Sequence, residues 1–350
     1  MSLMEKTVQV FDNAGKAQAI GDEIARGGEG AVHALSARPS VVVKLYHPEL
    51  LKQRGTALSE KVEAMAQLRD RFDAPALAWP AISVYDEHGS WRGYAMRRAG
   101  GVPLTKLAHP MLYHKHAANL DRNHVVRFLV ALIKNLGRLH GAGVCLGDIN
   151  LNNFLYDHTT GTVTLIDCDS YQVEAQGRVF PCAVGAPDMT PPEHHGVSFS
   201  QVRRTPESDL FSLAILIFRC LMLGRHPYDF VGGGTVVENL RQGHFPYGTG
   251  GAAPGREGAI PAGPWYLIWS HLSFELKSLL IRTLREGAAD PAMRGRPSEW
   301  LIALEKYAGG LRKGYHDPAL RPLTHKSAER KGNFPAQAGT PNPAATRSFF

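Results

Sequence analysis

Three polar residues occupy an otherwise apolar stretch near the middle of the chain, LGDINLNNFLYDHTTGTVTLIDCDSYQV, residues 146–173. Asp148 and Asn153 lie five positions apart, and Asp167 follows the run TLI as though at the end of a buried strand. Burying carboxylates and an amide is costly, so each group must be paired within the protein or must hold a ligand. The segment therefore predicts a polar site beside a short β-hairpin.

A second candidate site lies in ARGGEGAVHAL, residues 25–35, ahead of the strand-like run SVVVKLY. Gly27, Gly28 and Gly30 lack a Cβ, which would let backbone amides approach a phosphate closely. A plain hairpin turn would use the same glycines, so this pattern alone leaves both interpretations open. Lys44 ends the valine run, and a lysine in so apolar a strand needs an anion, either a carboxylate or a ligand phosphate.

Two kinds of sequence pattern must position these residues. Short β-rich runs bounded by Gly, Pro or Asp predict strands in the first hundred residues, interrupted by one helix at 56–68. Helical spacing dominates afterwards, in NHVVRFLVALIKNLGRLHGAG and in an apolar helix at 208–223 that we expect to be buried on every side. The predicted fold class is α+β, with a small β-rich lobe at 1–98, a larger helical lobe at 99–309 and a ligand cleft between them.

Composition narrows the class of protein. Hydrophobic residues make up 44% and charged residues 20% of the 350 residues, as in ordinary folded proteins. The four cysteines show no metal-ligand spacing, so we expect buried, reduced thiols and a cytoplasmic location. No leader peptide is expected at the first residues, and the longest apolar run, 210–223, is shorter than the roughly 20 residues of a membrane span.

The net charge of +7 is concentrated at the end of the chain, where residues 310–350 contain seven Lys and Arg against two acidic residues. This segment has no apolar period and predicts a flexible basic tail. A solvated linker, the start of a linker to a further domain, a contact with a partner protein and a contact with nucleic acid would all suit such a tail. We therefore expect nucleic acid to be bound through the tail, if at all, and not through the folded part.

The order of these motifs, from about residue 23 to 304, resembles that of the eukaryotic-type Ser/Thr protein kinases. GDINLNN has the spacing of the catalytic loop, and LIDCD is similar to the metal-binding motif that follows it. PPEHH, SDLFSLAILIF and RPSEWLIAL resemble the end of the activation segment, the central helix and a late Arg-Pro motif. The combination also looks like a bacterial branch linked with helix-hairpin-helix DNA-binding segments, or encoded near von Willebrand A-type and PP2C-type phosphatase proteins.

The resemblance implies a bilobal protein-kinase-like fold, ATP and Mg²⁺ as cofactors, and phosphoryl transfer to Ser or Thr of a protein, autophosphorylation included. Asp148 would be the catalytic base, and Asn153 and Asp167 would bind metal. Lys44 would hold the α- and β-phosphates, itself held by a helix carboxylate, for which Glu60 is preferred and Glu63 stays open. The implied nucleotide-binding residues are Gly27, Gly28, Gly30, Val32, Lys44, Met96, Arg97 and Ala99, although Met96 would serve equally as core filler. The implied structural residues are Glu193, Asp209 and Arg296, with Arg296 as the partner of Glu193.

The sequence also departs from the kinase pattern. Gly147 replaces the arginine that usually docks an activation-loop phosphate, which predicts activity without phosphorylation of that loop. The hydroxyl residues between Asp167 and Glu193 are Ser170, Tyr171 and Thr190. Asn150 stands where protein kinases usually carry a lysine, a change that we expect to slow transfer unless another cation takes its place. Asp169 replaces the glycine of D-F-G, either as a further carboxylate on the metal side or as a loop cap.

These departures leave two other function classes open. A pseudokinase would bind nucleotide and transfer little phosphate. A small-molecule phosphotransferase of the aminoglycoside-kinase type would use a similar catalytic loop. PPE, SDLFSL and RPSEW favour a protein kinase, because they resemble the helical region that forms its peptide platform.

Overall fold

The structure is a computed structural model that describes residues 9–71, 76–248, 255 and 258–326. Its first part is a closed barrel in which the strands follow the order β1, β2, β3, β4, β6, β5. Val10, Val43 and Val84 lie inside it, because alternate residues of a strand face the same side. The strands are β1 (Gln9–Phe11), β2 (Ala17–Arg26), β3 (Gly30–Leu35), β4 (Val41–Tyr46), β5 (Ile82–Tyr85) and β6 (Trp91–Arg97).

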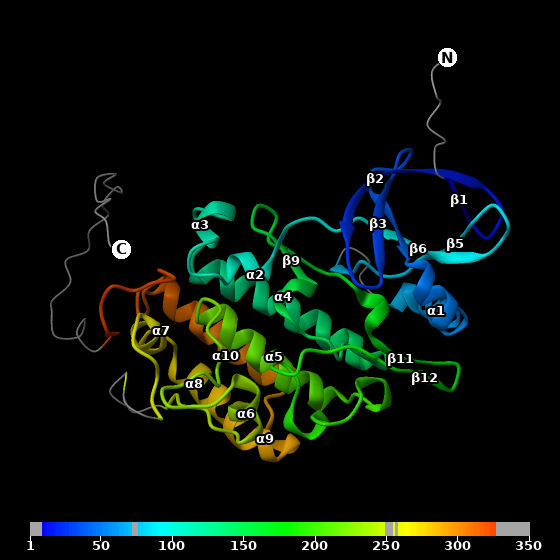
Figure 1. Ribbon diagram of the computed structural model, residues 1–350. Helices are drawn as coiled ribbons and strands as arrows, with labels where there is room; N and C mark the ends of the chain where they lie inside the picture. Colours follow the sequence, from blue (N-terminus) through cyan, green and yellow to red (C-terminus); the bar gives the residue numbers. More distant parts are fainter. Residues whose placement is uncertain (1–8, 72–75, 249–254, 256–257, 327–350) are drawn as a thin grey trace.

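Helix α1 (Pro48–Leu68) packs on the outside of the barrel, against β5 and β6 (Figure 1). It begins eight residues earlier than the predicted 56–68, since Pro48 occupies the first turn, where a missing backbone donor costs nothing. The buried side of the helix is formed by Leu58, Lys61, Val62, Ala64, Met65 and Leu68. A charged residue, Lys61, thus lies on the face that the helix turns inward.

The rest of the described chain is mainly helical, which confirms the predicted α+β class. Helix α5 lies at its centre, and 13 of its 16 residues are buried, as its continuous apolarity predicted. A capping box formed by Thr205 and Ser208 begins this helix. The helices are α2 (Leu104–Leu107), α3 (Tyr113–His116), α4 (Arg122–Gly141), α5 (Pro206–Leu221), α6 (Val236–Arg241), α7 (Trp265–Ser270), α8 (Phe274–Ile281), α9 (Gly287–Ala289) and α10 (Pro297–Arg312), with a π-helical turn at Arg282–Glu286.

Two small sheets lie beside these helices, next to the barrel (Figure 1). One has the order β10, β9, β7 and the other the order β12, β11, β8. Their strands are β7 (Val102–Pro103), β8 (Val144–Cys145), β9 (Phe154–Asp157), β10 (Thr162–Leu165), β11 (Gln172–Ala175) and β12 (Arg178–Phe180). The connections between β8 and β9 and between β10 and β11 contain the polar residues that the sequence singled out. Single 3₁₀ turns lie at Arg69–Arg71, Leu151–Asn153, Cys168–Ser170, Pro192–His194, Phe199–Gln201 and Pro291–Met293.

The predicted boundary of the C-terminal tail at residue 310 is wrong, because α10 continues to Arg312 and the next residues pack on the helices. Arg122, which is 1% exposed, donates from Nε to the carbonyl oxygen of Ala319 at 2.8 Å. Leu320 is buried in the core, and the ring of His271 hydrogen-bonds the carbonyl of Thr324. Residues 310–326 therefore belong to the folded part, and the rest of the predicted tail, 327–350, lies outside the described residues.

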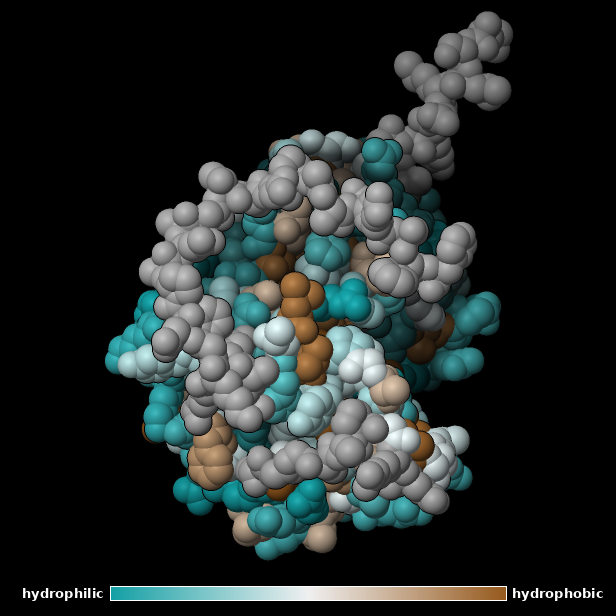
Figure 2. All heavy atoms as spheres, turned by 90° about the vertical axis from the view of Figure 1, so that its left-hand side faces the viewer, coloured by the Kyte–Doolittle hydropathy of each residue, from teal (hydrophilic) through white to brown (hydrophobic). Residues whose placement is uncertain are grey.

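One face of the molecule can be compared with its hydropathy pattern in Figure 2. Figure 2 shows mainly hydrophilic residues, with scattered hydrophobic ones, over the face of the helical region that carries α3 and α7. No helix in the described ranges combines the length and the apolarity that crossing a bilayer requires. All four cysteines are buried and unpaired, as the sequence predicted.

Candidate active site

The catalytic-loop candidates Asp148 and Asn153 lie together between β8 and β9. The Asn153 amide donates from Nδ2 to Oδ2 of Asp148 at 3.1 Å and to the Asp148 carbonyl at 2.9 Å. Asn150 donates to the same Oδ2 at 3.0 Å and, through its own Oδ1, accepts from the backbone of Asn152. Two amides therefore orient one carboxylate. Among the described residues no donor meets Oδ1 of Asn153, so this oxygen can accept from, or coordinate, another group.

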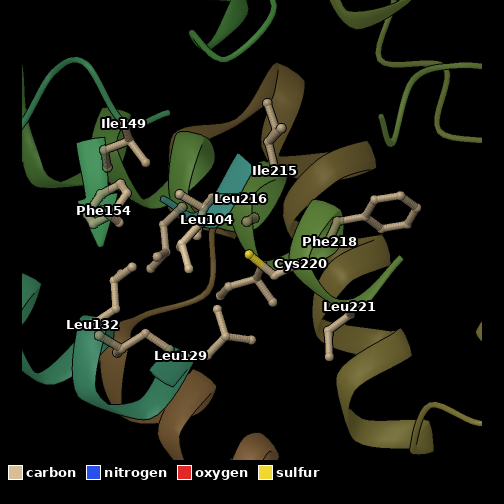
Figure 3. Close-up of a cluster of buried hydrophobic side chains, with 14 of the residues drawn as sticks. Leu104, Leu129, Leu132, Ile149, Phe154, Ile215, Leu216, Phe218, Cys220 and Leu221 are labelled. Carbon is tan, nitrogen blue, oxygen red and sulfur yellow. The ribbon is translucent and has the colours of Figure 1, made fainter. Parts of the chain in front are cut away.

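Apolar residues between these polar ones hold the loop in the core. Ile149, Leu151 and Phe154 are at most 3% exposed. Figure 3 shows Ile149 and Phe154 in one buried cluster with Leu132 of α4 and Leu216 of α5. Because polar and apolar residues alternate along this loop, anchoring the apolar ones presents Asp148 on the opposite side. Packing against α4 and α5 thus fixes the loop that carries the carboxylate.

Asp209 anchors the backbone just before Asp148. Its carboxylate accepts from the backbone N–H groups of Leu146 at 2.7 Å and Gly147 at 2.9 Å. The ring of His140 lies 2.9 Å from the same carboxylate. Gly147 has φ +70°, and a Cβ there would lie 2.7 Å from the sulfur of Cys182, so this backbone leaves no room for the arginine of the kinase pattern.

Asp167 follows β10 in the left-handed backbone conformation, with φ 54° and ψ 35°. Its side chain is 54% exposed and borders the cavity described below. Desolvation raises the pKa of Asp167, and the nearby Asp169 and Asp148 add to this, although Lys44 opposes them. Clustered carboxylates of this kind attract a cation, and hard oxygen donors suit Mg²⁺.

Lys44 lies at this cluster, but its closest partner is not the predicted one. Its Nζ donates to Oδ2 of Asp169 at 2.7 Å, whereas Asp167 lies at 3.7 Å and Glu29 at 3.9 Å. Asp169 is 4% exposed and also accepts from the hydroxyls of Tyr46 at 2.6 Å and Tyr94 at 2.8 Å. Burial alone would raise the pKa of Asp169, but Lys44 and the hydroxyl donors outweigh it and lower this pKa.

The prediction that Glu60 holds Lys44 is wrong for this structure. Glu60 lies on the outer side of α1 and accepts from Arg178 at 2.9 Å. Glu63, the open alternative, is also exposed. The helix instead turns Lys61 inward, where its Nζ donates to the Pro181 carbonyl at 3.0 Å and burial lowers its pKa to about 8. Sequence spacing did not reveal which face of α1 packs against the barrel.

A cavity of about 410 Å³ brings most of the predicted nucleotide-site residues together. Asp148 and Asp167 border it from the helical region, and the glycine loop and Lys44 border it from the barrel. A larger cavity of about 590 Å³ at the barrel shares only Met96 and Arg97 with this set and lacks both carboxylates. The predicted residues that line the smaller cavity are Gly27, Gly28, Gly30, Val32, Lys44, Met96, Arg97, Ala99, Asp148 and Asp167.

The three loop glycines differ in what they contact. A Cβ on Gly30 would collide with the carbonyl oxygen of Leu45, so the packing of β3 on β4 requires this glycine. A Cβ on Gly28 would meet no atom within 4 Å. Gly27 donates its backbone N–H to Gly30 at 2.8 Å and closes the turn. Strand packing thus accounts for Gly30 and the turn for Gly27, while Gly28 leaves open space beside the cavity.

Glu193 is paired as predicted with an arginine of the late motif, but with a different one. Nη1 and Nη2 of Arg294 donate to the Glu193 carboxylate, at 2.7 and 2.8 Å, and the Arg294 side chain is fully buried. Arg296, the predicted partner, is exposed at the start of α10. The segment MRGRP offers two arginines two positions apart, and only the path of the chain into α10 decides between them.

The segment between Asp167 and Glu193 is fixed by contacts that need no phosphate. Thr190 is 1% exposed and donates to the Ala186 carbonyl at 2.8 Å. Tyr171 is fully buried, and Ser170 donates to the carbonyl of Asp167 at 2.8 Å. Arg204, which no sequence motif singled out, donates to the Val184 carbonyl at 3.1 Å and packs on the ring of Phe199. A buried arginine thus holds this segment beside Gly147.

Comparisons with known proteins show which proteins the sequence is similar to. No protein-family profile matches the chain. The chain is 30% identical over 325 residues to protein kinase YegI of Escherichia coli K12, covering 89% of this chain and 48% of that protein. It is 29% identical over 317 residues to the protein of the same name from Escherichia coli O157:H7, covering 87% of this chain and 47% of that protein. The chain thus spans about half the length of the curated relatives it matches, and over most of its own length it is distantly homologous to these two proteins.

Proposed function

We propose that this chain is a Ser/Thr protein kinase with a bilobal protein-kinase-like fold, which transfers the γ-phosphoryl group of ATP to a protein hydroxyl. The observation that carries the proposal is the place of Asp148 at the junction of two cavities. It borders the 410 Å³ cavity with Lys44 and Asp167, and also a cavity of about 390 Å³ lined by the loop 150–152 and the segment 184–189. A nucleotide in the first and a substrate hydroxyl in the second would meet at its carboxylate.

The residues present fit a magnesium-bound nucleotide. Asp167 presents a half-exposed carboxylate to the cavity. Asn153 directs its Nδ2 toward Asp148, and its amide oxygen accepts no hydrogen bond from the residues that the structure describes. These two residues would hold the metal, which neutralises phosphate charge when bound. Lys44 carries a buried positive charge beside the glycine loop, where it would bind phosphate oxygens.

The chain's own residues would contribute mainly positioning. Asp148, oriented by Asn150 and Asn153, would orient the attacking hydroxyl and accept its proton. Met96, Arg97 and Ala99 border the cavity at the strand end that leads out of the barrel, where an adenine ring would lie. Asp209 would keep the catalytic loop in register through the backbone of Leu146 and Gly147.

Transfer of labelled phosphate from Mg·ATP tests the proposal. The full chain is incubated with labelled Mg·ATP, alone and with a general protein acceptor, and Asp167→Ala is the control. Metal-dependent labelling of Ser or Thr, identified by mass spectrometry and lost in Asp167→Ala, would support it. Nucleotide binding without transfer would favour a pseudokinase, and labelling of aminoglycoside-type acceptors but not of protein would favour a small-molecule phosphotransferase. Association with von Willebrand A-type or phosphatase partners stays a prediction.

A further inference from the structure

The residue that holds Lys44 comes from the segment that also carries the proposed metal ligand. We propose that Asp169 is the positioning residue for Lys44, in place of a carboxylate on helix α1; this inference rests on the proposed kinase function. Asp169 and Lys44 are 125 positions apart in the chain and form a 2.7 Å hydrogen-bonded ion pair. The other carboxylates near this amine, Asp167 and Glu29, lie 1 Å or more farther away.

The barrel presents three donors to Asp169 from one face. Lys44 and Tyr46 are two positions apart on β4, so their side chains lie on the same side of the strand. Tyr94 lies directly opposite Lys44 in the pairing of β4 with β6. All three donate to Asp169, and the two tyrosines are at most 2% exposed. Without this carboxylate the buried hydroxyls of Tyr46 and Tyr94 would lose their acceptor, so the donors of the barrel and the acceptor Asp169 complement each other.

The same contacts separate the roles of Asp167 and Asp169. Both carboxylate oxygens of Asp169 are engaged by donors of the barrel, and the side chain is 2% exposed. Asp167 instead has a side chain that is 54% exposed and borders the cavity. Asp167 is therefore available to a metal, whereas Asp169 is neither a further carboxylate on the metal side nor a simple loop cap.

This arrangement changes what the position of α1 controls. Where a helix carboxylate holds the lysine, moving the helix releases the lysine. Here residues 167–169 supply both the carboxylate that holds Lys44, Asp169, and the proposed metal ligand, Asp167. Helix α1 instead contributes Lys61, which donates to the Pro181 carbonyl. The charges on the outer side of α1, Glu60 and Glu63, should therefore have little effect on phosphate transfer.

Matched carboxylate-to-amide variants test the assignment. Asp169→Asn keeps the size of the side chain but removes its charge, and Glu60→Gln and Glu63→Gln make the same change on α1. Two quantities are measured for each: kcat and KM for ATP, and the pKa of Lys44 from NMR of isotope-labelled lysine ε-carbons assigned with Lys44→Met. Thermal unfolding reports whether each variant is folded.

We expect Asp169→Asn to lower kcat/KM about tenfold or more and to lower the pKa of Lys44. Burial lowers this pKa, and the variant removes the charge of Asp169 that opposes burial, while Asp167 and Glu29 remain. Both α1 variants should stay within about twofold of the parent rate, with the pKa of Lys44 unchanged. If Asp169→Asn does not fold, Tyr94→Phe is used, which keeps the carboxylate but removes one donor and should produce a smaller change in the same directions.

The two proposals fail in different ways. If the parent chain transfers no phosphate, the proposed function fails, while the titration of Lys44 still reports whether Asp169 is its partner. The positioning role is overturned if the pKa of Lys44 stays unchanged in Asp169→Asn. It is also overturned if Glu60→Gln or Glu63→Gln lowers kcat/KM as much as Asp169→Asn does.

Discussion

The two walls of the nucleotide-sized cavity are built by contacts of different range. On the wall formed by the helical region, Asp148 and Asn153 are five positions apart and hydrogen-bond each other directly. On the barrel wall, Lys44 is held by a carboxylate 125 positions away. The spacing of Asp148 and Asn153 predicted that they lie on one loop. The partner of Lys44 was predicted on helix α1, whereas it is Asp169. Residue spacing therefore predicts which side chains lie together where one loop supplies all of them. It predicts this poorly where the side chains come from distant parts of the chain.

Among the variants considered, Asp148→Asn, on the cavity wall formed by the helical region, should have the largest effect on the transfer rate. Removing the proposed base should lower kcat by about 10²–10⁴-fold, because the hydroxyl proton then has no acceptor. Binding of Mg·ATP should persist, since Lys44 and Asp167 are unchanged. Initial rates and calorimetry measure the two quantities. Asp157→Asn in the β9–β10 turn is the matched control, and an equal loss there would show that the rate reports stability and not chemistry.

Glu193 and Arg294 form a second pair between distant parts of the chain, and the free energy of unfolding tests it. Arg294→Ala should lower the free energy of unfolding by about 3 kcal/mol, because it leaves a partly buried carboxylate without its bidentate partner. Arg296→Ala removes an exposed side chain and should cost less than about 1 kcal/mol. Denaturant unfolding of both variants measures this difference. Equal losses would contradict the pairing seen here.

The buried Lys61 on α1 predicts a pH-dependent stability. Its pKa is about 8 in the folded protein and 10.5 ordinarily, so the unfolded chain binds more protons between these values and stability rises with pH there. Lys61→Met should remove this rise, which is on the order of 2 kcal/mol between pH 8 and 10.5. Denaturant midpoints across that range measure it. Lys52→Met, on an exposed position of the same helix, should keep the rise, and its loss there would disprove the assignment.

Removal of phosphate groups from the protein's own hydroxyl side chains should have the smallest effect on the transfer rate. Ser170, Tyr171 and Thr190 are buried or engaged in the folded segment, and Arg204 holds that segment through the Val184 carbonyl. Treatment with a phosphatase should therefore change the transfer rate by less than about twofold. Rates before and after treatment, with mass spectrometry to follow the three hydroxyls, provide the measurement. A large loss of rate would mean that phosphorylation orders the segment after all.

Most of the cavity lining was predictable from the resemblance to protein kinases, which rests on the order of the glycine-rich loop, VVVK and D-x4-N and not on any one of these motifs alone. The partner of Lys44 was not predictable. The segment SEK resembles the kinase motif that carries the helix carboxylate, but the packing of α1 turns Lys61 inward. The position of Arg296 in a motif predicted it as the partner of Glu193, whereas the structure pairs Glu193 with the buried Arg294. The tail boundary was placed too early because a segment held by backbone contacts, such as that of Arg122 with Ala319, has no apolar period to reveal it.

The sequence by itself determined the α+β class, the apolar central helix and the presence of Asp148 and Asn153 on one short loop, because hydrophobic periodicity and short loops act over a few residues. Only the tertiary structure decided which acid meets Lys44, which arginine meets Glu193 and where the folded part ends. These choices depend on how whole elements rotate and dock, and burial then selects one of several chemically equivalent side chains.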